Sequence, residues 1–360
     1  ETAGLKVFGV NRVAARFEGS KCFAQEFAGR HNLPFAKGKC FDDPEQAKAF
    51  VRSLGGRSVV KAESLSKGKG VTPHLTFEEA NTAIDDLLVR HTLGSAGKRI
   101  VIQEFLEGEE LSLHILCDGT NWRLMPTAQD YKRLLDGNKG PMTGGIGAYS
   151  PHQGLSFEEV QAMAEAIMTP FLKGCVAEGI VFKGVLYVGL MLTKNGAKIL
   201  EFNVRFGDPE AQVILPRLKT DLAELLLATA EGRLAEVPIE VYEDRAAVCV
   251  VLCAPGYPKD PVLGKKIESV AWSKGVHGVK LFHSGTRCDG PNLVTSGGRI
   301  FGATAWTYAP QRSRLTEAEA LELAWGSAYC AAKLVKIEDG FHIRYDICQG
   351  HVPSHNLSLE

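Results

Sequence analysis

The sequence has no excess of charge of one sign and no long hydrophobic run. Lysine and arginine together number 41 and aspartate and glutamate 42, which leaves no basic excess of the kind that nucleic-acid-binding surfaces show. No apolar stretch approaches the roughly 20 residues that a membrane helix requires. No secretory signal opens the sequence. We therefore expect a cytoplasmic protein with no nucleic-acid partner and no membrane partner.

Paired cysteine motifs are also missing. The nine cysteines are an odd number, lie scattered along the chain and include no Cys-x-x-Cys pair. Cys249 and Cys253 lie four residues apart on a predicted buried strand, a position that suits packing better than zinc binding. We expect reduced thiols, as in a cytosolic protein.

What is present is an ordinary globular composition, 45% hydrophobic and 23% charged over 360 residues, which is enough for two or three domains. Residues 1–20 resemble the end of a domain, with a strand end at 4–9 and a short helix near 12–16. The sequence therefore looks as though it opens inside a domain. A main domain is predicted at residues 21–237 and a smaller C-terminal domain at 244–348. A tail is predicted at 349–360.

The hydrophobic pattern predicts a mixture of helices and strands. Thr76-Phe-Glu-Glu79 and Ser156-Phe-Glu-Glu159 are capping boxes, and Lys194-Asn-Gly196 predicts a hairpin turn. Further helices are predicted near 21–31, 43–54, 210–217 and 221–233, and from 316. Strands are predicted at 57–63, 99–105, 111–118, 121–127, 183–193, 197–204, 246–254, 279–283, 299–304 and 342–345. Residues 136–151 are rich in glycine and lack periodicity, which predicts a functional loop.

The most informative segment is a late strand that ends in Glu201-Phe-Asn-Val-Arg205. Side chains on a strand alternate between faces, so Glu201, Asn203 and Arg205 are predicted to share one face. Leu200, Phe202 and Val204 are predicted to share the other. A carboxylate and an amide oxygen suit Mg²⁺, and a guanidinium beside them suits a phosphate oxygen. An edge strand with a solvated polar face would show the same pattern.

Three lysines lie at the end of an earlier strand and just after it. Lys61 ends the strand, and Lys67 and Lys69 alternate with glycines beyond it. Glycine lets a backbone approach phosphates closely, and ammonium groups neutralise the charge of a departing γ-phosphoryl group. The spacing is that of neither a Walker loop nor a Rossmann fingerprint. A solvated turn is the competing interpretation.

A hinge is predicted where Gln103-Glu-Phe-Leu106 ends one strand and Glu109-Glu110 opens the next. Such a hinge can offer backbone groups to an adenine edge and a carboxylate to ribose hydroxyls. A plain acidic turn is the alternative.

Charged residues also precede the Gly-rich segment 136–151. They are Asp130, Lys132 and Arg133. Exposed backbone amides between small residues of that segment could wrap a carboxylate or a phosphate. A flexible linker is the alternative.

In this order, the motifs resemble those of an ATP-grasp domain, in which two α+β lobes clamp ATP between antiparallel sheets. They are similar to the motifs of the glycinamide ribonucleotide synthetase (phosphoribosylamine–glycine ligase) family, from about residue 1 to residue 346. The segments that carry the resemblance are 18–21, 61–71, 103–110, 140–151, 201–210, 256–258, 282–286 and 295–299. The implied fold is α+β, an ATP-grasp domain with its lid lobe at about 42–105, followed by a smaller C-terminal α/β domain. The family begins with a βαβ lobe, and the resemblance implies that residues 1–20 are the remnant of that N-terminal lobe.

The resemblance also implies an activity and its residues. ATP and Mg²⁺ (or Mn²⁺) would be the cofactors, and glycine and 5-phosphoribosylamine the substrates, joined through a glycyl phosphate in de novo purine biosynthesis. Glu201 and Asn203 would bind the metal, and Arg205, Lys69 and Asp208 would be catalytic. The residues implied for ATP are Lys61, Lys67, Lys69, Glu104, Leu106 (through its backbone) and Glu110. Those implied for the substrate side are Asp130, Lys132, Arg133, Thr143, Gly144 and Gly145.

The sequence departs from the family pattern at two positions on the substrate side. Tyr131 stands where the family has histidine, and Met142 where it has asparagine. The second change removes a hydrogen-bond donor and an acceptor, so it is expected to affect substrate contacts more than ATP binding. Two alternatives therefore stay open: an ATP-binding remnant that acts as a scaffold or regulatory module, and an ATP-grasp ligase for another acid or amine. Association with other purine-pathway enzymes or with a separate N-terminal lobe is a further expectation.

Overall fold

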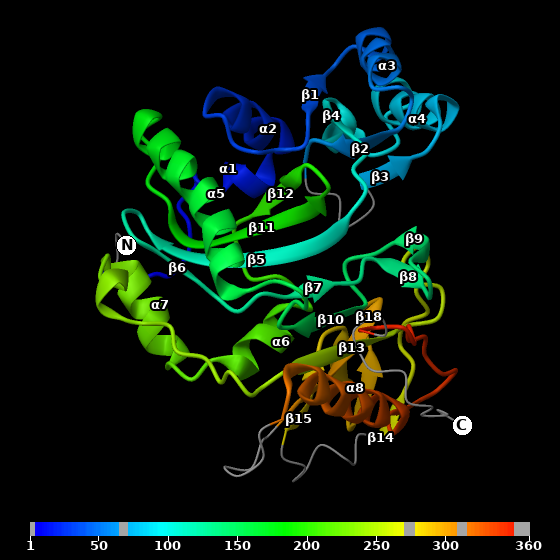
Figure 1. Ribbon diagram of the computed structural model, residues 1–360. Helices are drawn as coiled ribbons and strands as arrows, with labels where there is room; N and C mark the ends of the chain where they lie inside the picture. Colours follow the sequence, from blue (N-terminus) through cyan, green and yellow to red (C-terminus); the bar gives the residue numbers. More distant parts are fainter. Residues whose placement is uncertain (1–3, 65–70, 270–277, 308–314, 349–360) are drawn as a thin grey trace. The chain divides into compact units, whose positions relative to one another are not determined.

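The computed structural model describes residues 4–64, 71–269, 278–307 and 315–348. The chain divides into two compact units, which are described separately (Figure 1). Unit 1 comprises Glu1–Met125, Leu155–Gly207 and Thr220–Ile239, and unit 2 comprises Pro126–Gly154, Asp208–Lys219 and Glu240–Glu360. The domain limits predicted near residues 20, 237, 244 and 348 remain a prediction.

The first sheet of unit 1 is antiparallel, with the order β1-β4-β2-β3. Its strands are β1 (Gly38–Phe41), β2 (Ser58–Ala62), β3 (Val71–His74) and β4 (Ile100–Glu104). Helices α3 (Pro44–Ser53) and α4 (Phe77–Ile84) bury Val51 and Ile84 against Val60 and Ile102. A π-helical turn (Asp85–Val89) and a 3-10 turn (Gly94–Gly97) follow. The predicted capping box is confirmed, because Thr76 and Glu79 exchange hydrogen bonds at the start of α4.

The second sheet of unit 1 is also antiparallel, with the order β12-β11-β5-β6. Phe17, Phe171 and Phe202 meet in its core, with ring centroids 4.9 to 6.0 Å apart. The helix α5 covers one face of this sheet (Figure 1). The elements are α1 (Arg16–Gly19), α2 (Lys21–Arg30), β5 (Glu109–Asp118), β6 (Trp122–Leu124), α5 (Phe157–Ala177), β11 (Lys183–Thr193), β12 (Gly196–Asn203), α7 (Leu222–Glu231) and a 3-10 turn (Leu234–Glu236).

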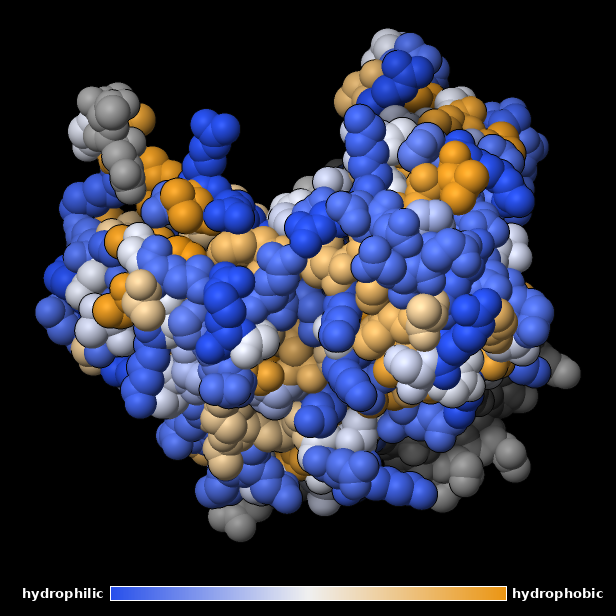
Figure 2. Space-filling model, turned by 90° about the horizontal axis from the view of Figure 1, so that it is seen from above, coloured by the Kyte–Doolittle hydropathy of each residue, from blue (hydrophilic) through white to orange (hydrophobic). Residues whose placement is uncertain are grey.

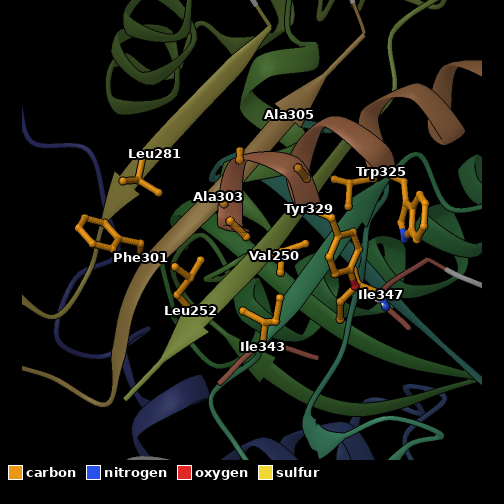
Figure 3. Close-up of a cluster of buried hydrophobic side chains, with 14 of the residues drawn as sticks. Val250, Leu252, Leu281, Phe301, Ala303, Ala305, Trp325, Tyr329, Ile343 and Ile347 are labelled. Carbon is orange, nitrogen blue, oxygen red and sulfur yellow. Dashed lines mark hydrogen bonds between the residues drawn. The ribbon is translucent and has the colours of Figure 1, made fainter. Parts of the chain in front are cut away.

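Unit 2 is built on an antiparallel sheet with the order β15-β18-β13-β10-β7. Figure 3 shows Trp325 and Tyr329 of α8 above Val250 and Leu252 of β13, in the core of this unit. The elements are β7 (Gln129–Asp130), β8 (Arg133–Leu135), β9 (Lys139–Met142), β10 (Gly147–Ser150), α6 (Ala211–Ile214), a 3-10 turn (Leu215–Arg217), β13 (Ala247–Cys253), β14 (Ile267–Ser269), β15 (Val279–His283), β16 (Thr286–Asp289), β17 (Asn292–Thr295), β18 (Arg299–Trp306), α8 (Glu317–Lys333) and β19 (Lys336–Ile337).

Four local predictions are wrong. The predicted strand end at 4–9 is not a strand, and the helix that follows is α1 at Arg16–Gly19 instead of 12–16. The predicted strand at 342–345 is reduced to a single bridge between His342 and Cys253. The predicted loop 136–151 contains β9 and β10. Strand β10 has the sequence Gly-Ala-Tyr-Ser, which carries no β-branched residue, so its pairing with β13 and its burial make it a strand.

Apolar and polar side chains are mixed on the surface. On the face drawn in Figure 2, hydrophobic residues lie among hydrophilic ones, as is ordinary for a folded protein. Within the described ranges, none of the helices has the length and apolar character needed to cross a bilayer.

Candidate active-site residues

The polar face of β12 carries the predicted metal ligands. Glu201 and Asn203 alternate with the buried Phe202 and pair with Gly189 and Tyr187 of β11. A Cβ atom on Gly189 would lie 3.5 Å from the Cγ atom of Glu201, in ordinary van der Waals contact, so Gly189 and Glu201 face the same side of the sheet. The carboxylate and the amide are both half-buried. The two oxygen-bearing side chains therefore share the face opposite the core, as the alternation predicts.

The prediction for Leu200 is wrong. The pairing of β11 with β12 shifts register between Gly189 and Leu190, so Leu200 has no partner on β11. Ile199 is fully buried in the core next to Phe202, whereas Leu200 is half-buried and lies outside that core cluster. The extra residue of a β-bulge has changed the alternation at this point.

Arg205 follows the end of β12 and lies beside Asn203. Its Nη2 atom is 3.4 Å from the Oδ1 atom of Asn203, and its Nε atom is 3.0 Å from the Oε1 atom of Glu18. The other oxygen of Glu18 accepts the backbone N–H of Val204 at 2.9 Å. Glu18 thus fixes both the end of the strand and the arginine.

Lys61 on β2 is nearly buried and donates to the backbone carbonyl of Leu200 at 2.9 Å. It contacts the residue that precedes Glu201, so the predicted phosphate lysine lies next to the predicted metal strand. Lys67 and Lys69 lie outside the described residues. Within the described part of the chain, no three His, Cys, Asp or Glu side chains gather as a metal cluster. A divalent ion at Glu201 and Asn203 would therefore take further ligands from phosphates and water.

The predicted adenosine residues lie at the hinge between the two sheets of unit 1. Glu104 ends β4, and its Oε1 atom accepts the backbone N–H of Lys37 at 2.7 Å. Leu106 is half-buried, and Glu110 on β5 pairs with Met191. A Cβ atom at Gly108 would lie 2.0 Å from the carbonyl oxygen of Leu192, so only glycine fits this turn.

The predicted substrate residues of unit 2 form one connected group. The carbonyl oxygen of Lys132 accepts both the N–H and the hydroxyl of Thr143, at 2.7 and 2.9 Å. The Nζ atom of Lys132 lies 3.7 Å from Asp130, which is buried. Arg133 donates to the carbonyl of Gly140 at 2.7 Å. The structure thus joins residues 130–133 to the Gly-rich segment.

The Gly-rich segment differs from the expected cradle of exposed amides. The N–H of Gly144 donates to the hydroxyl of Tyr257 at 3.1 Å, and that of Gly145 to the hydroxyl of Thr143 at 3.1 Å. Gly145 has a φ of +105°, and a Cβ atom there would lie 2.6 Å from the Cδ atom of Pro209. These two amides are engaged within the protein, so side chains are the better candidates for binding a ligand here.

Comparison with known proteins places the chain in a family. The model of the phosphoribosylglycinamide synthetase ATP-grasp (A) domain matches residues 19–211, and that of the C domain matches residues 247–350. The chain belongs to the phosphoribosylglycinamide synthetase family. The expected ATP-grasp fold and C-terminal domain are confirmed.

Individual members of this family are similar to the chain over most of its length. A phosphoribosylamine–glycine ligase of Escherichia coli is 44% identical over 331 residues, which is 91% of this chain and 77% of that protein. A chloroplastic phosphoribosylamine–glycine ligase of Arabidopsis thaliana is 43% identical over 349 residues, 96% of this chain and 63% of that protein. The crystal structure of phosphoribosylamine–glycine ligase from Thermotoga maritima matches with a TM-score of 0.81 and 33% identity, over 95% of this chain and 81% of that one. A biotin carboxylase domain of Hydrogenobacter thermophilus, 16% identical with a TM-score of 0.71, shares the fold.

Within this family framework, the sequence reasoning gave Lys21 no role. Lys21 begins α2 after the cap Ser20, and its Nζ atom lies 3.4 Å from the carbonyl oxygen of Ser64. Burial lowers the pKa of Lys21, while the charges of Glu201 and Glu18 act in the opposite direction. Lys21 therefore lies within electrostatic range of the predicted metal carboxylate, Glu201. Its signal in the sequence was the segment 18–21, which belongs to the family resemblance.

Arg299 also received no role from the sequence. Its Nη1 atom donates to the carbonyl oxygens of Gly144, Gly145 and Asp208, at 2.8, 3.2 and 2.8 Å. Its Nη2 atom lies 3.0 Å from the Asp208 carboxylate, which also accepts from Gln212 at 2.8 Å. The predicted catalytic Asp208 and the Gly-rich segment are thus held by one guanidinium.

A buried histidine supports the turn after Arg205. The Nε2 atom of His114 accepts the backbone N–H of Gly207 at 2.9 Å, and its ring stacks on Tyr187 with centroids 4.6 Å apart. Burial, together with the charge of Arg205, lowers the pKa of His114 to about 3. The imidazole is therefore neutral at physiological pH. Sequence reasoning missed it because a single histidine on a buried strand carries no motif.

Proposed function

We propose that this chain joins glycine to 5-phosphoribosylamine at the expense of ATP, giving glycinamide ribonucleotide, ADP and phosphate in purine biosynthesis. Membership of the phosphoribosylglycinamide synthetase family supports this activity. The observation that carries it is the pair of Glu201 and Asn203 on one face of β12, with Lys21 and Arg205 beside them.

The proposed chemistry needs no protein nucleophile. A carboxylate oxygen of glycine attacks the γ-phosphorus of ATP, the bond to the bridging oxygen breaks, and ADP leaves. The amine of 5-phosphoribosylamine then attacks the acyl carbon of the glycyl phosphate. Phosphate leaves with its bonding pair, and the nitrogen loses a proton. Catalysis is then positioning of the reactants and stabilisation of charge.

For the ATP side, we propose that Glu201 and Asn203 hold Mg²⁺ or Mn²⁺. The fit lies in the donor set, one carboxylate and one amide oxygen on one strand face. The metal, when bound, neutralises negative charge on phosphate oxygens. Arg205 and Lys21 supply positive charge at the same strand. The residues proposed to contact ATP are Lys61, Lys67, Lys69, Glu104, Leu106 and Glu110.

For the substrate side, we propose the connected group in unit 2. Lys132 and Arg133 are the cations of this group, and Asp130 and Asp208 are its carboxylates. Thr143, Gly144 and Gly145 set the backbone around them. This arrangement suits a substrate that carries both a phosphate and an amine. A cytoplasmic location and the association with other purine-pathway enzymes or a separate lobe remain predictions, which imaging of a tagged chain and co-purification test.

The test is ADP release with Mg-ATP, glycine and 5-phosphoribosylamine, each omitted in turn. We expect release only with all of them present. Glu201→Ala should abolish metal-dependent turnover and leave the melting temperature unchanged, and Glu165→Ala, on the exposed face of α5, should have no effect. Unchanged activity of Glu201→Ala would refute the assignment. Nucleotide binding without turnover would favour the ATP-binding remnant, and turnover with another acid or amine would favour a different ligase.

A further inference from the structure

Two buried glutamines of unit 1 form an amide pair beneath the predicted metal strand. Gln103 on β4 is 3% exposed, and its Nε2 atom donates to the Oε1 atom of Gln25 on α2 at 2.8 Å. The amide nitrogen of Gln25 donates in turn to the carbonyl oxygen of Ala36 at 3.1 Å. The family resemblance and the proposed function assign no role to either side chain.

The hydrogen bonds of the amide pair extend to the backbone of β12. The same Nε2 atom of Gln103 donates to the carbonyl oxygen of Leu200 at 3.3 Å, and Lys61 donates to that oxygen at 2.9 Å. Leu200 lies where the register of β11 and β12 shifts. Two donors from the first sheet of unit 1 therefore replace the strand partner that the bulge removes.

The backbone of β1 packs closely against the amide pair at Gly38. A Cβ atom on Gly38 would lie 2.8 Å from the Cγ atom of Gln103 and 2.9 Å from the Oε1 atom of Gln25. Gly38 therefore lets the backbone of β1 press against both glutamines. Buried amides with satisfied hydrogen bonds define a local geometry more sharply than apolar contacts do.

We propose that Gln25 and Gln103 are positioning residues for the divalent metal of the proposed ligase reaction. The plane of the peptide between Leu200 and Glu201 sets the direction in which Glu201 leaves the backbone. At a bulge, that plane is not fixed by the neighbouring strand. Gln103 fixes it through the carbonyl of Leu200, and Gln25 fixes Gln103. The proposal rests on the proposed function, because it assumes that Glu201 binds the metal.

The test measures Mn²⁺ affinity by electron paramagnetic resonance, with a non-hydrolysable ATP analogue bound and no turnover. Gln103→Met keeps the volume and removes both donors, and we expect metal affinity to fall on the order of tenfold. The apparent Mg²⁺ activation constant should rise by the same factor, with the affinity for the analogue alone unchanged. Gln25→Met should have a smaller effect, and the double variant should be no worse than Gln103→Met, because both residues act through one carbonyl.

Two further variants keep the test decisive. Thr229→Val removes a buried hydrogen bond of α7 far from the glutamines in the chain, so it controls for lost stability and should leave metal affinity unchanged. Gln103→Glu keeps the size of the side chain and replaces the N–H donors with an acceptor oxygen. This variant should lower the Mn²⁺ affinity, and it provides a test even if Gln103→Met does not fold.

The outcomes separate this proposal from the proposed function. Wild-type metal affinity in folded Gln103 variants would overturn the positioning role. Equal loss of analogue affinity with and without metal would also overturn it, since Gln103 would then be a nucleotide contact. A wild-type chain that binds Mn²⁺ but does not ligate would refute the proposed function alone, and the variants would still decide the positioning role.

Discussion

Arg205 in unit 1 and Arg299 in unit 2 both lie in segments that carry the family resemblance, yet their surroundings differ. The Arg205 side chain is 56% exposed and has one carboxylate partner, Glu18. The Arg299 side chain is 21% exposed and donates to three backbone carbonyls as well as to Asp208. The guanidinium is open to solvent although Glu18 is only 12% exposed, so solvent screens this ion pair from the Arg205 side and Arg205 can exchange its partner for a phosphate. Arg299 instead stabilises the backbone of unit 2 through its hydrogen bonds to carbonyl oxygens.

The same contrast separates the two groups of candidate residues. In unit 1, Glu201 is half-buried on the polar face of β12, and its charge acts on Lys21. In unit 2, the polar groups already have hydrogen-bond partners within the protein. The N–H groups of Gly144 and Gly145 donate to side-chain hydroxyls, and the guanidinium of Arg299 donates to the carbonyl oxygen of Gly144. A charged residue is therefore better judged as a ligand-binding group by its exposure and by the partners that it can exchange than by its motif alone.

Among the variants that test this comparison, the largest effect is expected for Arg205→Ala. Removing a cation that acts on developing phosphoryl charge should lower turnover by about 10²–10³-fold, with little change in the free energy of unfolding. Steady-state kinetics and a denaturant titration measure the two quantities. Arg90→Ala, which removes an exposed arginine paired with Asp86, is the matched control. A large loss of stability in Arg205→Ala would make the two arginines alike and break the comparison.

Arg299→Ala should instead lower the free energy of unfolding more than it lowers turnover. It leaves the carbonyl oxygens of Gly144, Gly145 and Asp208 without this donor, at a cost of roughly 2–3 kcal/mol in unfolding free energy. Thermal and denaturant unfolding check this loss. If turnover falls strongly while stability stays at the wild-type value, Arg299 acts on the substrate and the architectural interpretation fails.

Some of these residues could be predicted from the sequence and others could not. Period-two alternation placed Glu201 and Asn203 on one face, because the rule depends only on neighbouring residues. The same rule failed at Leu200, since a bulge depends on how β11 pairs with β12. Lys21 and Arg299 were missed as functional residues because α2 and β18 bring them to partners far away in the sequence.

A smaller effect is expected at His114, whose removal probes the turn after Arg205. His114→Leu leaves the N–H of Gly207 without its acceptor, which should cost about 1–2 kcal/mol at pH 8. Urea unfolding at a series of pH values measures it, with turnover assayed in parallel.

The pH dependence of that effect has a definite sign. Burial lowers the pKa of His114 from 6.5 to about 3, so between these values the unfolded chain binds a proton that the folded chain does not. The contribution of His114 to stability is therefore complete above pH 6.5 and is lost as the pH falls, by up to about 1.4 kcal/mol per pH unit. The stability gap between wild type and His114→Leu should narrow below pH 6.5. A gap that stays constant would mean that the histidine titrates alike in both states.

The smallest effect is expected for Met142→Asn, which restores the family residue in unit 2. Met142 pairs with Arg133 between β9 and β8, inside the connected group proposed for the substrate. A new amide there adds one hydrogen bond worth about 1 kcal/mol, so the KM for 5-phosphoribosylamine should fall by about fivefold. The KM for ATP should stay constant, because the nucleotide residues proposed here belong to unit 1. A change in the KM for ATP alone would contradict the proposed division of labour between the two groups of residues, and initial-rate kinetics with each substrate varied in turn decide between these results.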